Sequence, residues 1–441
     1  MGSNDNKCMN RSDMNGFWVD PSLASVAFLS EGVASHFFGY YGISPWSLDN
    51  ARLLAHSTRA SSPFIPEGES VGLGWFDLDT GGFNQFEETH ACNWQQGSLL
   101  RWMPGSNDTV IFNTRVDGRA FARICEISTG KKHDLPRPVH AVAPNGHFGL
   151  SVNVERLYYT RRAYSYEHSY DTLWSKSVVE GDGVFRIDFG TGDAQLVVST
   201  AELAQREPTP TMHGARHWVD HPMIAPDNGT FLFYHRWMTG DGSFFSRLYT
   251  LNTDGTGLKR YADGGMYSHA TWLDSDEFVV FARPVGRDAR SAGGRHGLKQ
   301  RLLALALPAY RKTRRFPVIR GLRRRILKDR YFVFSVTGGE EGDVLSDQLL
   351  EDGHPSFNPK DPALFLTDTY PDSKGRQHLL LLNRRTGDLK RIAWFQAPKG
   401  VDSTTADRCD LHPRWDRSGT SICVDVMLKR GKRQVCVLEL N

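Results

Sequence analysis

The sequence predicts an all-β fold, a seven-bladed β-propeller in which residues 1–441 form a single domain. Three observations predict it. A short unit recurs seven times, the shorter intervals between its copies match the length of one propeller blade, and Gly-containing turns separate short β-rich runs. A propeller closes its sheets into a ring and protects the strand edges without a second domain.

The recurring unit has a fixed order of residue types. A first residue is followed by an apolar residue two or three places on, then by a turn rich in Pro, Asp, Asn or Gly, then by a β-rich run. Its copies start at Ile43, Leu99, His140, His221, His269, His354 and His412. Because residues just before an innermost strand lie at one rim of a propeller, we expect these histidines to point towards one axis. The alternative for any single histidine is a hydrogen bond to the backbone of the next blade.

A second hairpin follows most copies of the unit. In each, two alternating runs flank a Thr-Gly or Asp-Gly turn, which is a strong hairpin signal. The hairpins cover residues 70–86, 122–135, 183–198, 247–262 and 378–393. The chain after His412 is too short for four strands, so the N-terminal segment is expected to add a strand to the last blade. The two long intervals between copies predict insertions at about 156–182 and 283–330.

Composition excludes some classes of function. The net charge of +3 gives no general argument for binding nucleic acid. None of the six cysteines forms a Cys-x-x-Cys pair, and several lie in apolar runs, which indicates a reducing compartment. The first residues lack the basic and apolar regions of a secretory signal, so a cytoplasmic location is expected. No apolar run is long enough for a transmembrane helix.

The insertion at 283–330 is strongly basic. It holds 16 Lys and Arg against two Asp. One interpretation is a solvated loop, and the other is a surface that contacts a polyanion or a membrane. It has few interleaved aromatic residues, which argues against binding of single-stranded nucleic acid.

Several stretches resemble known lyases. "HPMIAPDNGTFLFYHRW", "RLYTLNTDGTGLKRY", "SHATW" and "DGHPSFNP" follow the order seen in oligogalacturonate lyases, and "GYYGISPW", "CNWQQG" and "RCDLHPRW" extend the resemblance to propellers of the ulvan lyase type. The resemblance implies a lyase that cleaves a uronic-acid-containing acidic oligo- or polysaccharide by β-elimination. It also implies a divalent metal ion, Mn, Zn or Ca, in the central site.

The resemblance implies roles for particular residues. His221 matches the base, and His269 and His354 match metal ligands, with Asp352 in place of a further ligand. We therefore expect a metal held by several histidines of the rim, namely His217, His221, His269, His354 and His412. The "CNWQQG" stretch supplies substrate-binding candidates Asn93, Gln95 and Gln96, and its two glutamines stand where an ulvan lyase would carry a catalytic histidine.

β-Elimination from a uronate needs a neutraliser of the carboxylate, a base and an acid for the leaving oxygen. The stretch "RLYYTRRAYSYEHSY" offers both tyrosines and arginines: we expect Tyr164 or Tyr166 as the proton donor, against the alternative of packing tyrosines. Arginines that fit a carboxylate are Arg156, Arg161, Arg162, Arg236 and Arg414. His235 is a further candidate base or a satisfied core residue. In "RCDLHPRW", Asp410 could orient His412 or share its metal.

Two other classes of function compete with the lyase. A non-catalytic propeller of the TolB type would act as a scaffold for protein or glycan partners. A propeller glycosidase would need paired carboxylates at the channel, whereas the repeat positions carry histidine. The sequence contains no phosphate-binding loop, dinucleotide fingerprint, nucleophile elbow or HExxH motif.

Overall fold

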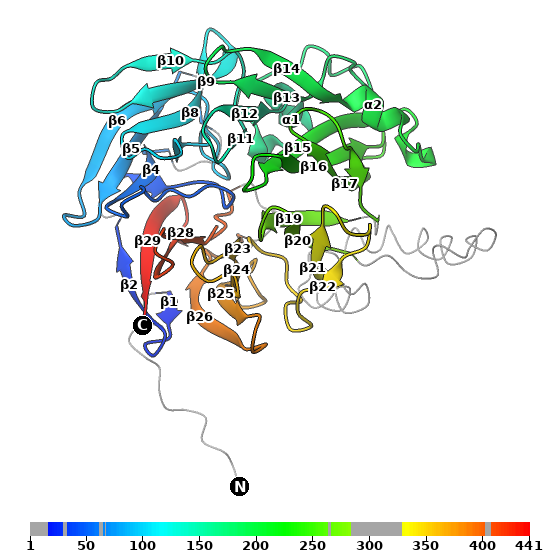
Figure 1. The fold of residues 1–441 in the computed structure, drawn as a ribbon. Coiled ribbons are helices and arrows are strands. Elements are labelled where there is room, and N and C mark those ends of the chain that lie inside the picture. Colours follow the sequence, from blue (N-terminus) through cyan, green and yellow to red (C-terminus); the bar gives the residue numbers. More distant parts are fainter. Residues whose placement is uncertain are drawn as a thin grey trace. The chain divides into compact units, whose positions relative to one another are not determined.

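The computed structural model describes residues 16–29, 33–60, 65–66, 68–262, 266–283, 329–401 and 407–441. Its described strands form seven antiparallel sheets, six with four strands and one with five. The protein is a seven-bladed β-propeller, as the sequence predicts (Figure 1). The chain forms two compact units, which are described one at a time. The first comprises Met1–Pro138, Leu157–Tyr170 and His354–Asn441, and the second comprises Val139–Arg156 and Asp171–Gly353.

The first unit contains blades 1, 2, 6 and 7. Blade 1 consists of β3 (Ser35–Phe37), β4 (Arg52–Thr58), β5 (Val71–Asp77) and β6 (Phe83–Thr89). Blade 2 consists of β7 (Arg101–Trp102), β8 (Thr109–Val116), β9 (Arg119–Glu126) and β10 (Lys132–Asp134). Blade 6 consists of β23 (Ser356–Phe357), β24 (Leu364–Asp368), β25 (Arg376–Asn383) and β26 (Leu389–Gln396), with β1 (Phe17–Val19) at its edge. Blade 7 consists of β27 (Arg414–Trp415), β28 (Ser421–Lys429), β29 (Lys432–Leu440) and β2 (Ala24–Phe28).

The N-terminal segment supplies strands to two blades. β2 pairs with β29, with Ala24 opposite Leu440, and Figure 1 shows this blue strand beside the red one. The predicted N-terminal strand of the last blade is thus confirmed. β1 pairs with β26 as a fifth strand of blade 6, with Phe17 opposite Phe395, a pairing that the sequence did not predict. Blade 7 therefore combines the N-terminal strand β2 with the C-terminal strand β29, and β1 covers an edge of blade 6.

The second unit contains blades 3, 4 and 5. Blade 3 consists of β11 (Ala141–Val142), β12 (Phe148–Ser151), β13 (Gly183–Asp188) and β14 (Ala194–Ser199). Blade 4 consists of β15 (Arg216–Ile224), β16 (Thr230–Met238), β17 (Phe244–Asn252) and β18 (Lys259–Arg260). Blade 5 consists of β19 (Tyr267–Trp272), β20 (Glu277–Ala282), β21 (Arg330–Ser335) and β22 (Asp343–Val344).

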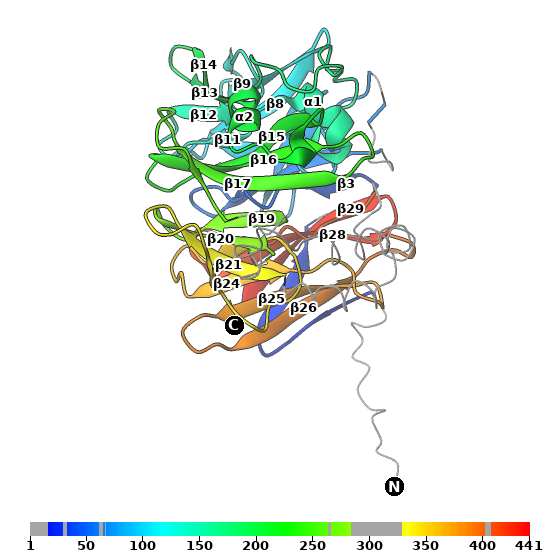
Figure 2. The ribbon, with the colours of Figure 1, turned by 90° about the vertical axis from the view of Figure 1, so that its right-hand side faces the viewer.

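The described helices are short and lie in the connections. α1 (Val154–Thr160) and η2 (Arg162–Tyr164) separate β12 from β13, whereas α2 (Thr200–Gln205) and η3 (Pro210–Met212) separate β14 from β15. The Ser199 hydroxyl caps α2 by accepting a hydrogen bond from the Glu202 amide at 3.0 Å. Figure 2 shows α2 beside β15, which it contacts. In the part of the chain that the structure describes, no helix has the length and apolar character to cross a bilayer.

Alternating apolar residues build the cores between neighbouring blades. In the first unit, Leu366 and Leu379 of blade 6 share one buried cluster with Val424 and Leu438 of blade 7. In the second unit, apolar residues of blades 4 and 5 form the equivalent cluster. The cysteines that the structure describes, all buried and free, are Cys92, Cys125, Cys409, Cys423 and Cys436. Residues 284–328 lie outside the described residues, so the role of the basic insertion stays a prediction.

Candidate metal centre

The first residue of the recurring unit has an unusual backbone conformation in three blades. Leu99, His221 and His412 have φ values of 57°, 54° and 48°. A residue other than glycine is uncommon in this left-handed region, and such conformations concentrate at functional sites. His221 lies at an irregularity of β15 between Asp220 and Met223, where the register with β16 shifts. His412 comes just before β27.

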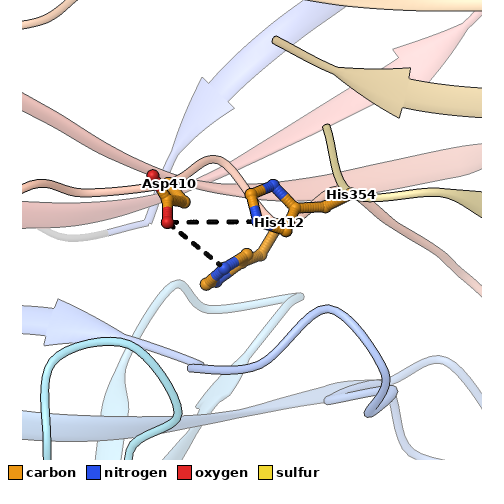
Figure 3. Close-up of side chains that lie close together, drawn as sticks. All are labelled: His354, Asp410 and His412. Atoms are coloured by element: carbon orange, nitrogen blue, oxygen red, sulfur yellow. Dashed lines mark ion pairs between the residues drawn. The ribbon is translucent and has the colours of Figure 1, made fainter. Parts of the chain in front are cut away.

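Three buried side chains of the first unit converge. His354 precedes β23, and Asp410 and His412 precede β27. Asp410 Oδ2 lies 3.9 Å from His354 Nε2 and 4.0 Å from His412 Nε2, and one ligand atom of each residue lies within 4.8 Å of the others (Figure 3). Each residue is at most 2 % exposed. We call these three residues the metal cluster.

Hydrogen bonds to the Asp368 carboxylate and to the Gly39 carbonyl orient the two histidines. His354 Nδ1 donates to the Asp368 carboxylate at 2.9 Å, and the same carboxylate accepts from the amides of His354 at 2.6 Å and His412 at 3.2 Å. His412 Nδ1 donates to the Gly39 carbonyl. A hydrogen on Nδ1 makes Nε2 the acceptor nitrogen of each ring. Both acceptor nitrogens therefore face Asp410, as ligands with hydrogen-bonded outer groups do in metal sites.

The charge state of the metal cluster also suits a cation. Burial alone would raise the pKa of Asp410, but the Arg408 guanidinium and the two imidazoles bring it down to about 2. Burial lowers the pKa of His412 well below its usual value, so this imidazole is neutral at neutral pH. Arg408 Nε donates to Asp410 Oδ2 at 3.0 Å. Asp410 Oδ1 is buried and has no hydrogen-bond partner among the described residues.

The ligand atoms of the metal cluster restrict which metal ions can bind there. Two imidazole nitrogens and one carboxylate oxygen are ligands that Zn²⁺ and Mn²⁺ accept, whereas Ca²⁺ favours oxygen ligands alone. Metal–ligand bonds of about 2.0–2.2 Å place two ligands of one ion up to about 4 Å apart, which matches the separations from Asp410. Three protein ligands leave further coordination positions for water or substrate. The side chains present therefore fit a divalent metal ion.

Aromatic rings surround the metal cluster. The Tyr41 ring lies 5.2 Å from that of His354 and 6.2 Å from that of His412, and Tyr370 lies 5.8 Å from His354. The Tyr164 hydroxyl accepts a hydrogen bond from Arg408 Nη2 at 3.3 Å. Tyr164, one of the two expected proton donors, is thus linked to Asp410 through Arg408.

Tyr166, the other expected donor, has a different environment. Its ring is 2 % exposed, and its hydroxyl accepts a hydrogen bond from Asn113 Nδ2 at 2.7 Å. This environment is typical of a packed core tyrosine, and of the two residues Tyr164 has the more direct connection to the metal cluster.

Arg156, expected to bind substrate, instead fixes the backbone of the second unit. Its side chain is fully buried and donates to the carbonyls of His217 at 2.7 Å and Lys176 at 2.8 Å and to Asp171 at 3.0 Å. These bonds stabilise the connection between β12 and β13. The sequence did not reveal this use because its acceptors come from two separate segments, residues 171–177 and His217.

The other arginines expected to bind substrate differ in their partners. Arg162 forms a two-point ion pair with Glu167 at 2.9 and 2.7 Å, and the Arg161 guanidinium lies 4.3 Å from the centre of the Tyr164 ring. Arg236 Nε donates to Asp220 at 2.7 Å in the second unit. Arg414 begins β27, and burial lowers its pKa to about 10.

The "CNWQQG" residues form a buried turn. Asn93 Oδ1 accepts from the amides of Gln95 at 3.0 Å and Gln96 at 2.7 Å, and all three residues are at most 5 % exposed. Gln95 Nε2 donates to the Arg408 carbonyl at 3.0 Å. Of these substrate-binding candidates, Gln95 therefore supports the backbone of Arg408, and Asn93 holds the turn.

The remaining expected site residues belong to the second unit. Both ring nitrogens of His217 have protein partners, since Nδ1 lies 2.9 Å from His235 Nε2 and Nε2 lies 3.2 Å from the Met212 carbonyl. Burial lowers the pKa of both His217 and His235. His217 and His235 therefore form a buried structural pair. Either histidine would have to break this contact to bind a metal or to act as a base.

His221 and His269 each face a carboxylate within the second unit. His221 Nδ1 lies 3.0 Å from Asp220 Oδ1, and the His221 ring lies 6.0 Å from that of His140. His269 Nδ1 lies 3.1 Å from Asp352 Oδ1. Asp352, expected as a metal ligand, thus makes the contact of an outer carboxylate that orients His269.

Two parts of the metal cluster's support could not be predicted from the sequence. Asp410 stands two residues before His412, and this spacing is the available signal for a shared metal. Asp368 and Gly39 carried no such signal. Asp368 ends β24 fourteen residues after His354, and Gly39 is 373 positions from His412.

Comparisons with known proteins show which solved structures have a similar fold. No family model and no curated protein matches the chain. Two similar solved structures are an "oligogalacturonate lyase in complex with manganese", with 16% identity and a TM-score of 0.61, and an oligogalacturonate lyase from Vibrio parahaemolyticus, with 11% identity and a TM-score of 0.56. Each alignment covers 96% of both chains. The resemblance read from the sequence is therefore confirmed for the fold: this chain is a seven-bladed β-propeller structurally similar to oligogalacturonate lyases.

Proposed function

We propose that the protein is a lyase that cleaves a uronic-acid-containing oligo- or polysaccharide by β-elimination. The observation that carries the proposal is the buried metal cluster of His354, Asp410 and His412. A similar solved structure is an oligogalacturonate lyase in complex with manganese, and the donor set here fits the same ion. Zn²⁺ is the alternative on the same ligand chemistry.

The reaction requires groups that this chain can supply. A divalent metal held by the metal cluster would supply positive charge that neutralises the carboxylate of the uronate and so acidifies the proton at C5. Tyr164 is the proposed proton donor to the leaving glycosidic oxygen, because Arg408 connects its hydroxyl with Asp410. Tyr370, which is partly exposed beside His354, provides an aromatic face against which a sugar ring can pack.

The expected base, His221, has a carboxylate beside it. Asp220 Oδ1 lies 3.0 Å from Nδ1, and a carboxylate in this position orients an imidazole and stabilises its protonated form. The role of base stays a prediction from the sequence. We expect His221→Ala to lower kcat by about 10²–10⁴-fold, the usual cost of losing a general base. Full activity of this variant would place the base elsewhere.

The proposed activity is tested by the ultraviolet absorbance of the unsaturated uronate product. Purified protein is incubated with polygalacturonate, ulvan and their oligomers, with Mn²⁺, with Zn²⁺ and after treatment with EDTA. We expect absorbance to rise with one of these glycans, to be lost with EDTA and to be lost in His354→Ala. His378→Ala is the matched control, since His378 is on the same blade and pairs with Asp372 outside the metal cluster. Absence of product from every acidic glycan would contradict the lyase and favour the scaffold.

A further inference from the structure

Arg414 is a cation with an unsatisfied side chain. It opens β27, where its backbone carbonyl accepts a hydrogen bond from Trp46 Nε1 at 3.4 Å. Its Nε is buried without a hydrogen-bond partner, and no ion pair or side-chain hydrogen bond joins it to another described residue. The residue as a whole is partly exposed.

Several other arginines with buried guanidinium groups are neutralised by a carboxylate oxygen within 3.0 Å, in the pairs Arg156–Asp171, Arg236–Asp220, Arg408–Asp410 and Arg433–Asp425. Arg247, which is also buried, donates instead to the backbone carbonyls of Arg206 at 3.1 Å and Glu207 at 2.9 Å. A guanidinium does not lose its proton in proteins, so Arg414 cannot avoid the cost of burial by becoming neutral. A charge kept under these conditions is explained when a ligand supplies the missing anion.

The position of Arg414 links it to the metal cluster. It follows His412 by two residues. Tyr41, whose ring lies 5.2 Å from that of His354 and 6.2 Å from that of His412, also interacts electrostatically with Arg414. An anion bound by Arg414 would therefore lie in the same part of the first unit as the metal cluster.

We propose that Arg414 is the receptor for one carboxylate of the ligand. The planar guanidinium matches a carboxylate in a two-point geometry that lysine cannot reproduce. The inference rests on the proposed function and deepens it, because it assigns the recognition of an acidic sugar to one arginine among the several that the sequence offers.

The test measures binding without turnover. Thermal unfolding of the EDTA-treated protein is followed with rising concentrations of galacturonate, which has no glycosidic bond to cleave, of its methyl ester and of sulfate. We expect galacturonate to raise the Tm of the wild type and the methyl ester to leave it unchanged. Arg414→Gln should lose this response, and Arg414→Lys should need about tenfold more galacturonate or higher for the same shift.

The matched control is Arg417→Gln, three residues on, whose exposed side chain donates to the Trp46 carbonyl at 3.0 Å. It should keep the galacturonate response. A second readout is the ligand-free Tm, which Arg414→Gln should leave unchanged or raise, because the variant removes an unneutralised charge. A structural arginine would behave in the opposite way, with a lower Tm on removal.

The outcomes separate this inference from the proposed function. An unchanged galacturonate response in both Arg414 variants would overturn it, as would an equal response of the wild type to sulfate, which would indicate a general oxyanion site. A galacturonate response that depends on Arg414 supports it even if no glycan yields an unsaturated product, and in that case only the lyase activity fails. If Arg414→Gln does not fold, the Tm response of Arg414→Lys to galacturonate decides between these outcomes.

Discussion

His412 shows how single residues determine the geometry of the metal cluster. Its ring is held by the Gly39 carbonyl and its amide by Asp368, while its φ of 48° turns the chain immediately before β27. Gly39 has a φ of 109°, and a Cβ there would lie 2.8 Å from the Gln96 carbonyl oxygen. Only glycine therefore lets this carbonyl reach His412, and a larger residue would shift it.

Substitution of Asp368 tests whether a single carboxylate orients the metal ligands. We expect Asp368→Asn to weaken Mn²⁺ or Zn²⁺ binding by about 10–100-fold, the usual cost of losing an outer carboxylate. The amide would keep one acceptor oxygen and set a donor group against the donors of His354 and His412. Isothermal titration of metal into the EDTA-treated protein measures the affinity.

Asp372→Asn is the control for that measurement. Asp372 also lies 3.0 Å from a histidine nitrogen, that of His378, but this pair is outside the metal cluster. The metal affinity of the Asp372→Asn variant should equal that of the wild type. If Asp368→Asn binds metal as tightly as the control, the carboxylate does not orient the ligands.

Among the elements, the innermost strands join neighbouring blades through tryptophan. The indole N–H of one blade donates to a backbone carbonyl near the start of the preceding blade. The bonds are Trp46 to Arg414 at 3.4 Å, Trp102 to Pro45 at 3.0 Å, Trp272 to Met223 at 2.9 Å and Trp415 to Ser356 at 3.4 Å. In these four units, the apolar residue three places after the start is this tryptophan. The residue packs in the core and also carries a directional bond.

Trp102→Phe isolates the hydrogen bond from the packing of the ring. We expect a loss of about 1 kcal/mol in the free energy of unfolding beyond the effect of the smaller ring, measured by urea denaturation. The Pro45 carbonyl keeps a second donor, the Leu54 amide, so no buried acceptor is stranded. Trp75→Phe on β5 is the control, because the Trp75 indole has no hydrogen bond among the described residues. Equal losses in the two variants would show that the bond contributes nothing.

A feature could be predicted from the sequence where the residues that form it are close together along the chain. The hairpin of residues 378–393 was readable because its turn chemistry and its two alternating runs are adjacent, and β25 and β26 pair there. The metal cluster was only partly readable. His354 and His412 stood out through the repeat, but the tertiary contacts of Asp368 and Gly39 join distant segments that only the fold brings together. The same limit hid the internal partners of Arg156.

For the whole molecule, buried histidines make stability depend on pH. Burial lowers the pKa of His36 and of His56 to about 4 from the usual 6.5. Between these values the unfolded chain binds protons that the folded chain does not, so the folded state loses stability as pH falls from about 6.5 towards 4. Burial raises the pKa of Asp182 and of Asp425 to about 6, which acts in the opposite direction over a similar range.

His36 allows the histidine contribution to be separated from that of the carboxyl groups. Its ring packs 5.1 Å from that of Phe76 and 4.6 Å from that of Phe83, and its Nδ1 has no hydrogen-bond partner among the described residues, so leucine suits the pocket. We expect His36→Leu to reduce the pH dependence of the unfolding free energy by up to about 1.4 kcal/mol per pH unit between pH 6.5 and 4. Urea denaturation of metal-free protein across that range measures it. His133→Leu, at an exposed position of β10, is the matched control. An unchanged slope in His36→Leu would mean that this imidazole gains its proton without unfolding, so its burial would have to be relieved by local opening.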